Sequence, residues 1–274
     1  MPLNNVLIVA SKQDTAGVNI TTHLSQLGDF KFYLVDNDIL HEENLDLEKI
    51  NKHDFIIFAS KHKSSSAENS EDYKKTLSIH SVGNFRDALY GGKKGKCSPS
   101  SAQFMKHLFQ TLIKENQSSS LDKNYEVTLE ATHHGPLISK PCLFIEIGPS
   151  EPEWKDNKAG FVVAKAIRDA IETFQPIEHR EIAIGIGGPH YCPLFNKVQE
   201  KTNVAISHII PQYILPIDEF MLQEVMNKTT EEEGIDFALV DWKGIGDEQS
   251  RKNIMETIDK LHLNHERVSD ILKR

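Results

Sequence analysis

The sequence Val6-Leu-Ile-Val-Ala10 is followed by a helical stretch from Thr15 to Leu27 and then by Lys31-Phe-Tyr-Leu-Val35. A short apolar run between polar turns is typical of a strand that is buried on both faces. Strand, helix and strand in this order predict the start of an α/β domain, in which helices pack on a mostly parallel sheet.

Further apolar runs with the character of strands extend this pattern toward the C-terminus. They cover residues 54–59, 125–131, 142–147, 181–186, 204–210 and 236–240. Helical patterns alternate with them at residues 157–174, 193–202, 217–227 and 247–261. In the first of these helices an apolar stripe recurs at helical spacing, at Gly160, Val163, Ile167, Ala170 and Phe174. We therefore expect a single three-layer α/β/α domain over residues 1–274, with a mixed, mostly parallel sheet.

Composition and charge limit the class of protein. The chain has 274 residues, 39% of them hydrophobic, and a formal net charge of -9, which argues against a protein that coats nucleic acid through its overall charge. The apolar run at Val6–Ala10 has no basic residue before it, so we expect no signal peptide, no membrane span and a cytoplasmic location. Cys97, Cys142 and Cys192 lie far apart, which indicates reduced thiols and excludes a four-cysteine zinc site.

The least regular part of the sequence, residues 61–96, is expected to be an excursion from the core. It contains a serine-rich part, a short strand Leu77–Ser81 and the sequence Gly91-Gly-Lys-Lys-Gly-Lys96. Residues 61–114 carry ten basic side chains against four acidic ones. Such a basic island suits the binding of one phosphate backbone, although a solvated lysine-rich loop would have the same composition.

Histidines follow several of the predicted strands. They are His62, His80, the adjacent pair His133 and His134, and His190. Ligands bind at the carboxyl ends of strands in open α/β sheets, so histidines gathered there favour a functional site, although a single histidine is more often structural. If the strand continues through His133 and His134, their side chains alternate and only one of them faces a given cavity.

Glu146 lies inside the apolar run Cys142-Leu-Phe-Ile-Glu-Ile147. A buried carboxylate needs a cationic, metal or hydrogen-bonding partner. A carboxylate and histidines with an open coordination position suit zinc, but the spacing matches no His-Glu-x-x-His signature. A hydrogen bond between Glu146 and a histidine, without metal, is the alternative. Trp154 follows on a predicted loop beside Glu146.

The sequence Gly185-Ile-Gly-Gly-Pro-His190 is neither a dinucleotide-binding fingerprint nor a Walker loop. Its glycines can bring backbone amides close to an oxyanion or a phosphate, or they can serve only a tight turn. No Gly-x-Ser-x-Gly elbow is present, and none of the cysteines is obviously activated as a nucleophile.

Six segments in order along the chain resemble the archaeal and plant type of D-aminoacyl-tRNA deacylase. They are Leu77-Ser-Ile-His-Ser-Val-Gly-Asn84, Glu130-Ala-Thr-His-His-Gly-Pro136, Phe144-Ile-Glu-Ile-Gly148 with Glu153-Trp154, Gly187-Gly-Pro-His-Tyr-Cys-Pro193, His208-Ile-Ile-Pro-Gln-Tyr213 and Asp241-Trp-Lys-Gly244. The resemblance implies a fold similar to the phosphorylase/peptidyl-hydrolase class, a monomer without an obligate protein partner, and zinc as cofactor. It also implies hydrolysis of the ester that joins a D-amino acid to tRNA, a form of translation quality control. The serine-rich segment between His62 and Leu77 is longer than in this pattern, and Ser207 stands where glycine is expected.

The resemblance assigns roles to particular residues. The expected metal ligands are His62, His80, His134 and His190. The expected catalytic residues are His80, His134, His190 and Glu146. The expected contacts to D-aminoacyl-tRNA are His133, Gly187, Gly188, Lys93, Lys94, Lys96 and Trp154, with the two glycine amides facing the oxyanion and the lysines facing phosphates. A metal-dependent hydrolase of peptides or nucleosides on the same fold, and a non-catalytic tRNA-binding module, are the alternatives.

Overall fold

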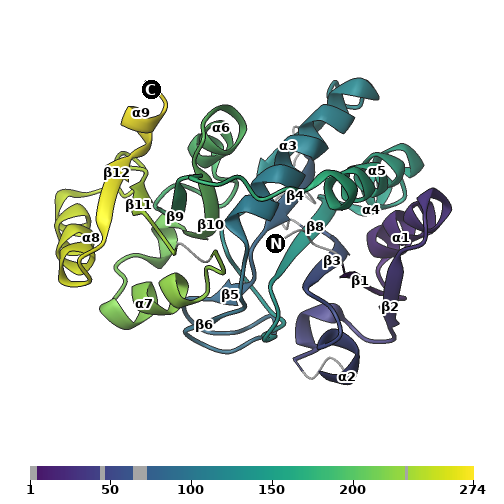
Figure 1. Ribbon diagram of the computed structural model, residues 1–274, viewed down its shortest axis with the longest axis horizontal. Coiled ribbons are helices and arrows are strands. Elements are labelled where there is room, and N and C mark those ends of the chain that lie inside the picture. Colours follow the sequence, from purple (N-terminus) through teal and green to yellow (C-terminus); the bar gives the residue numbers. More distant parts are fainter. Residues whose placement is uncertain (1–4, 44–46, 64–72, 232–233) are drawn as a thin grey trace.

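The computed structural model describes residues 5–43, 47–63, 73–231 and 234–274, and its strands form two main sheets (Figure 1). The larger sheet has the order β2-β1-β3-β8-β4-β7, with β1 Val6–Ser11, β2 Lys31–Val35, β3 Phe55–Lys61, β4 Lys75–His80, β7 Tyr125–Leu129 and β8 Cys142–Gly148. The smaller sheet has the order β10-β9-β11-β12, with β9 Ile182–Ile186, β10 Ala205–Ile210, β11 Phe237–Val240 and β12 Asn264–Arg267. A short ladder joins β5 Gly83–Asn84 to β6 Lys96–Cys97.

Strand directions confirm the predicted mixed, mostly parallel arrangement. The strands β2, β1, β3 and β8 run parallel, and so do all neighbours in the smaller sheet. The pair β4 and β7 is parallel within itself, but β4 runs antiparallel to β8. The two ends of β4 are therefore reversed relative to those of β3, which decides where the functional side chains meet.

Helices cover both faces of the sheets, as a three-layer fold requires (Figure 1). The upper layer in the figure contains α1 Thr15–Leu27, α3 Ala102–Ser118, α4 Glu151–Trp154, α5 Asn157–Thr173 and α6 Pro193–Lys201. The other helical elements are η1 Ile39–His41, α2 Leu47–Ile50, η3 Gln212–Ile214, α7 Glu219–Asn227, α8 Glu248–Lys260 and α9 Val268–Ile271. The helix α3 packs on β7 of one sheet and on β10 of the other.

The contact between α1 and α5 shows how the sequence fixes this layer. A Cβ atom at Gly160 would clash with the Asn19 amide, so a glycine is required at this crossing. Asn19 Nδ2 donates to the carbonyls of Trp154 and Asp156, both at 3.0 Å. Asp156 caps α5 through the backbone amides of Lys158 and Ala159. The predicted stripe is buried as expected, because it faces the sheet and α1.

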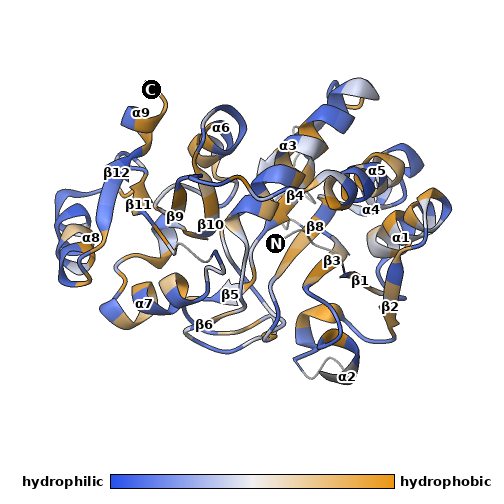
Figure 2. Cartoon of the chain, in the orientation of Figure 1, coloured by the Kyte–Doolittle hydropathy of each residue, from blue (hydrophilic) through white to orange (hydrophobic). Residues whose placement is uncertain are grey.

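Apolar side chains fill the two spaces between the layers, and the strands are the most continuously hydrophobic parts of the chain (Figure 2). Phe58 and Phe144 stack at 4.7 Å on the lower face of the larger sheet. Among the described residues, no helix combines the length and the apolar character that crossing a membrane would need.

The structure differs from the sequence expectation in two places. The helix α3 was not predicted, although Phe104, Leu108 and Leu112 are buried at helical spacing. The segment 61–96 is not wholly an excursion, because β4 lies between β8 and β7 in the middle of the larger sheet. Its Leu77 and Ile79 face one core while its alternate residues are polar, which shortens the apolar signal to two residues. Residues 64–72, the serine-rich part of the expected excursion, lie outside the described residues.

Candidate active site

The floor of the candidate site is one face of the larger sheet. Strand pairing places Ser60 of β3 and Ser78 of β4 on either side of Glu146 of β8. His62 and His80 lie two residues further along β3 and β4, on the same face. Because β4 is antiparallel to β8, the ends of β3 and β4 do not share an edge, and these side chains meet above β8 instead.

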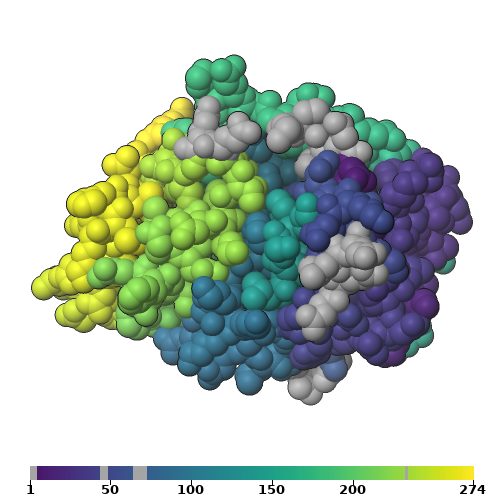
Figure 3. All heavy atoms as spheres, turned by 60° about the horizontal axis from the view of Figure 1, so that its bottom comes forward, coloured from purple at the N-terminus to yellow at the C-terminus, as the bar shows by residue number. Residues whose placement is uncertain are grey.

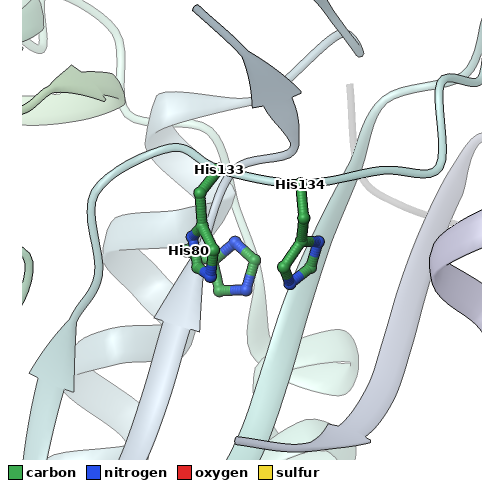
Figure 4. Close-up of side chains that lie close together, drawn as sticks. All are labelled: His80, His133 and His134. Atoms are coloured by element: carbon green, nitrogen blue, oxygen red, sulfur yellow. The ribbon is translucent and has the colours of Figure 1, made fainter. Parts of the chain in front are cut away.

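Three histidines, which we call the histidine triad, lie together above this floor: His80, His133 and His134 (Figure 4). Their ring centroids are 4.1 to 4.8 Å apart, and one nitrogen of each lies within 4.8 Å of the others. Each Nδ1 is 2.7 to 3.1 Å from a backbone carbonyl oxygen, those of Ser81, Ala131 and Gly135. A carbonyl can only accept, so each neutral ring carries its proton on Nδ1 and leaves Nε2 as a lone pair.

Two further observations indicate that the triad is ready to bind a cation. The Nε2 atom of His80 is buried and has no hydrogen-bond partner among the described residues. Burial and the neighbouring His80 ring lower the pKa of His133 well below its usual range and that of His134 to about 4. Both rings are therefore neutral, as metal coordination requires.

The expectation that only one of His133 and His134 faces the site is wrong. It assumed a continuing strand, but β7 ends at Leu129 and His134 has a φ of 39° in the left-handed region. The backbone amide of Gly83 donates to the carbonyls of both histidines, at 3.3 and 3.0 Å. Without strand geometry the side chains no longer alternate, and both rings contact His80.

A second group, which we call the carboxylate relay, lies beside the triad and consists of Glu130, His62, His190, Tyr191 and Tyr213. Glu130 contacts His62 Nδ1 at 3.1 Å through Oε1 and His190 Nε2 at 3.0 Å through Oε2. Each ring then meets a phenol: His62 Nε2 lies 2.9 Å from the Tyr191 hydroxyl, and His190 Nδ1 lies 3.2 Å from that of Tyr213. Glu130 thus connects two imidazoles to two hydroxyl groups.

Charge distinguishes the relay from the triad. Burial alone lowers the pKa of His62, but the carboxylates of Glu130 and Glu146 outweigh it and raise that pKa to about 12. Burial likewise opposes ionisation of Glu130, and the histidines around it hold its pKa well below the usual range. The His62–Glu130 contact is therefore a buried ion pair.

Glu146 joins the two groups, as the need of a buried carboxylate for a partner predicts. Its carboxylate oxygens lie 3.5 Å from His62 Nδ1 and 3.8 Å from His80 Nε2. Two sets of donor atoms besides the triad also lie close enough to hold a cation: His62, Glu130 and His190, and His80, Glu130 and Glu146. The four histidines expected as one metal site are thus divided between the triad and the relay.

The expected oxyanion contact at Gly187 is wrong. Its amide donates to the Ile210 carbonyl at 2.8 Å and is not free for substrate. Both Gly187 and Gly188 have positive φ, and they pack against Asp241, which is buried. The Asp241 carboxylate occupies the space next to Gly188, and its negative charge disfavours an oxyanion there. The two glycines serve the tight turn that delivers His190.

The lysines of the basic island are largely compensated in space. Lys94 pairs with Asp87 at 3.1 Å and Lys96 with Glu224 of α7 at 3.0 Å, while Lys93 is exposed. The Lys96–Glu224 pair joins the segment 83–97 to α7. The two segments lie side by side on the surface turned forward in Figure 3. Elsewhere in the island Lys106 is buried in the core. The sequence overstates the positive charge at Lys96, because Glu224 from a distant segment lies beside it, whereas Asp87 belongs to the island itself.

Trp154 belongs to α4 rather than to a loop. Its Nε1 donates to the His62 carbonyl at 3.0 Å, so it supports the backbone of a relay residue. The three cysteines are free and buried, and burial raises the pKa of each thiol. A thiolate nucleophile is therefore disfavoured at this site.

The sequence reasoning missed Glu130, Tyr191 and Tyr213 as site residues. Glu130 lies near the end of the strand predicted over residues 125–131, two residues before Thr132 and in the same segment as the histidine pair. A second carboxylate in an apolar run was the available sequence signal. Its position opposite the histidines depends on strand pairing, which places Glu130 next to His80 and Ile79.

Comparisons with known proteins identify the family of the chain and a similar solved fold. A family model described as D-aminoacyl-tRNA deacylase matches residues 49–266. The chain is 32% identical over 263 residues to the D-aminoacyl-tRNA deacylase of Thermococcus onnurineus, covering 87% of this chain and 91% of that protein. It is 31% identical to that of Methanococcus vannielii, covering 96% and 100%, and 34% identical to that of Archaeoglobus fulgidus, covering 87% and 88%. A crystal structure of a conserved protein of unknown function superposes with a TM-score of 0.86 and 28% identity, covering 98% and 97%.

Proposed function

Because the chain belongs to the D-aminoacyl-tRNA deacylase family, we propose that this site hydrolyses the ester of D-aminoacyl-tRNA and releases a free D-amino acid and tRNA. The observation that carries the chemistry is the contact between the histidine triad, in which His133 and His134 are neutral, and the charged carboxylate relay. Ester hydrolysis needs an activated water and a proton for the leaving oxygen, and the two groups divide these tasks.

The donor set of the triad fits zinc. Three imidazoles with Nδ1 held by backbone carbonyls leave three Nε2 lone pairs, and the Nε2 of His80 is buried without a partner. We propose that His80, His133 and His134 hold the metal, which would supply a water of lowered pKa at neutral pH. In this assignment His133 is a ligand rather than a substrate contact.

The relay supplies the proton chemistry. Water adds to the acyl carbon, the bond to the ribose oxygen breaks, and that oxygen must receive a proton. Protonated His62 can pass one through the Tyr191 hydroxyl, 2.9 Å away. Glu130, hydrogen-bonded to His190 Nε2, orients that imidazole as an acceptor for the proton of the attacking water. Glu146 and Trp154 are positioning residues, because they hold His62 and His80 in place.

Binding of tRNA is assigned to the lysine segment of the basic island. We propose that Lys93, Lys94 and Lys96, which are exposed, contact phosphates near the acceptor end. Charged tRNA is a cytoplasmic substrate, so the proposal places the protein in the cytoplasm, as a monomer.

The first test is release of D-tyrosine and L-tyrosine from their charged tRNAs, with and without a strong chelator. The expected result is rapid release of the D-amino acid that the chelator abolishes and zinc restores. His265→Ala is the control for substitutions of the site histidines, because His265 is exposed on β12.

Other outcomes separate the alternatives. Release of the D-amino acid at the same rate with and without the chelator would overturn the zinc assignment but retain the proposed hydrolase activity. Binding of D-tyrosyl-tRNA without release would indicate a non-catalytic binding module, and cleavage of peptide amides in preference to the ester would indicate a different hydrolase.

A further inference from the structure

A cavity of about 450 Å³ opens beside His190 and Tyr191. Its floor contains Thr76 of β4 with Glu126 and Thr128 of β7, on the same face of the sheet as Ser78 and Glu146. Its walls are formed by Tyr73, Lys74, Pro149, Pro189, His190, Tyr191 and Pro193. The cavity therefore continues the floor of the candidate site along β4 and β7.

We propose that this cavity receives the side chain of the D-amino acid during hydrolysis, an inference that rests on the proposed function. Tyr191 connects the two places, because it lines the cavity and its hydroxyl meets His62 Nε2 at 2.9 Å. An acyl carbon held within reach of the relay therefore places the neighbouring α-carbon where its side chain can enter the cavity.

The lining chemistry selects an amino-acid side chain over the terminal adenosine. Three prolines and two tyrosines give walls that suit an apolar or aromatic group. Lys74 Nζ pairs with Glu126 at 2.7 Å, so among the described lining residues this lysine is a compensated cation. Lys74 and Glu126 therefore cancel, and this pair leaves no net positive charge to attract the phosphate attached to the adenosine.

The size of the cavity indicates a wide range of side chains. Its volume falls within the range of small-molecule pockets and leaves room for an aromatic ring. Thr76 controls the depth, because it is buried and faces Gly148 of β8, which has no side chain, and Glu126 of β7. A larger residue at position 76 would fill the floor.

The test is Thr76→Leu, and the same change at an exposed position of α1, Thr22→Leu, is its control. We expect Thr76→Leu to lower kcat/KM for D-tyrosyl-tRNA on the order of tenfold or more, since steric exclusion from a pocket has effects of this size. D-alanyl-tRNA, with its small side chain, should remain within about twofold of the unmodified protein, and Thr22→Leu should leave both substrates unchanged.

Other results would overturn the inference. An equal loss for D-tyrosyl-tRNA and D-alanyl-tRNA would assign the cavity to the adenosine that both share, and no change with either would show that substrate does not enter it. If the unmodified protein releases no D-amino acid, the proposed function itself fails, and the inference with it.

Thermal unfolding checks that Thr76→Leu is folded. If it is not, Tyr73→Ala removes a wall from the half-buried rim instead. It should raise KM for D-tyrosyl-tRNA and leave D-alanyl-tRNA unchanged, and a uniform effect on both would again overturn the inference.

Discussion

The histidine triad and the carboxylate relay use the same side chain in opposite charge states. Burial lowers the pKa of His134 to about 4, and it also acts to lower that of His62, but there two carboxylates reverse it to about 12. The difference lies in the partner of Nδ1, which is a backbone carbonyl in the triad and Glu130 with Glu146 in the relay. For His134 and His62, the partner of Nδ1 thus decides whether the ring is neutral and can bind metal or is charged and can carry a proton.

His80 stands between the two groups. Its Nδ1 is held by the Ser81 carbonyl like the others of the triad, but Glu146 lies 3.8 Å from its Nε2. Burial lowers its pKa and Glu146 raises it, with a net rise. The raised pKa favours a proton on His80 Nε2, beside Glu146. A metal cation bound to Nε2 would take the place of this proton next to the Glu146 carboxylate.

The largest expected effect separates the groups by metal content. His134→Ala should lose bound zinc and with it nearly all hydrolysis, whereas His62→Gln should lose activity and still retain zinc. Zinc per chain, measured by elemental analysis after dialysis, is the readout. Equal zinc loss in both variants would show that the histidine triad and the carboxylate relay form a single metal site, contrary to the division made here.

A smaller effect is expected when the relay alone loses its charge. Glu130→Gln keeps the shape of the side chain but removes the anion, so His62 should become neutral near pH 7 and kcat should fall on the order of 10²–10⁴-fold, the range of general acid–base catalysis. NMR of the His62 ring nitrogens reports the lost proton independently of activity. Glu115→Gln, which changes a buried carboxylate paired with Lys165, is the control. A His62 ring that stays charged would contradict the assignment.

The smallest effect is expected from a surface change that touches neither group. Joint replacement of Lys93, Lys94 and Lys96 by alanine should raise KM and flatten the salt dependence of tRNA binding, while kcat is unchanged. Because Lys94 and Lys96 already pair with acids, we expect a rise of only a fewfold. The control is the triple replacement of Lys158, Lys201 and Lys252, which are exposed elsewhere. An unaltered salt slope would remove these lysines from the tRNA contact.

Apolar pattern predicted most of the fold, and the exceptions have physical causes. The helix α1 has the predicted limits Thr15–Leu27, because Asp14 caps it and its buried positions recur at helical spacing. The strand β7 was predicted to reach Ala131 but ends at Leu129. The next residues stay buried because they hydrogen-bond to the smaller sheet, where Thr132 donates to the Ile209 carbonyl at 3.0 Å. Local hydrophobicity cannot distinguish these two kinds of burial.

The candidate site was predictable as a set of residue types but not as two groups. The histidines and Glu146 could be recognised one by one, since each follows or interrupts an apolar run. Their division depends on the reversed direction of β4 and on the backbone turn at His134, which no spacing in the sequence encodes. The salt bridge of Lys96 depends on Glu224, which is more than a hundred residues away and was equally out of reach, whereas Asp87, the partner of Lys94, is one of the four acids counted within residues 61–114.

The position of α3 ties the chemistry to parts of the protein far from it. Glu130 follows β7 of one sheet, whereas His190 and Tyr213 come from segments that follow β9 and β10 of the other, so the relay closes across the seam between the sheets. The helix that packs on both sides of this seam does so through Phe104 and Leu108, which never meet the substrate. On warming, a small displacement of that helix would separate the His190 imidazole from the Glu130 carboxylate while every strand was still folded. Activity would then be lost at a lower temperature than the one at which the protein unfolds.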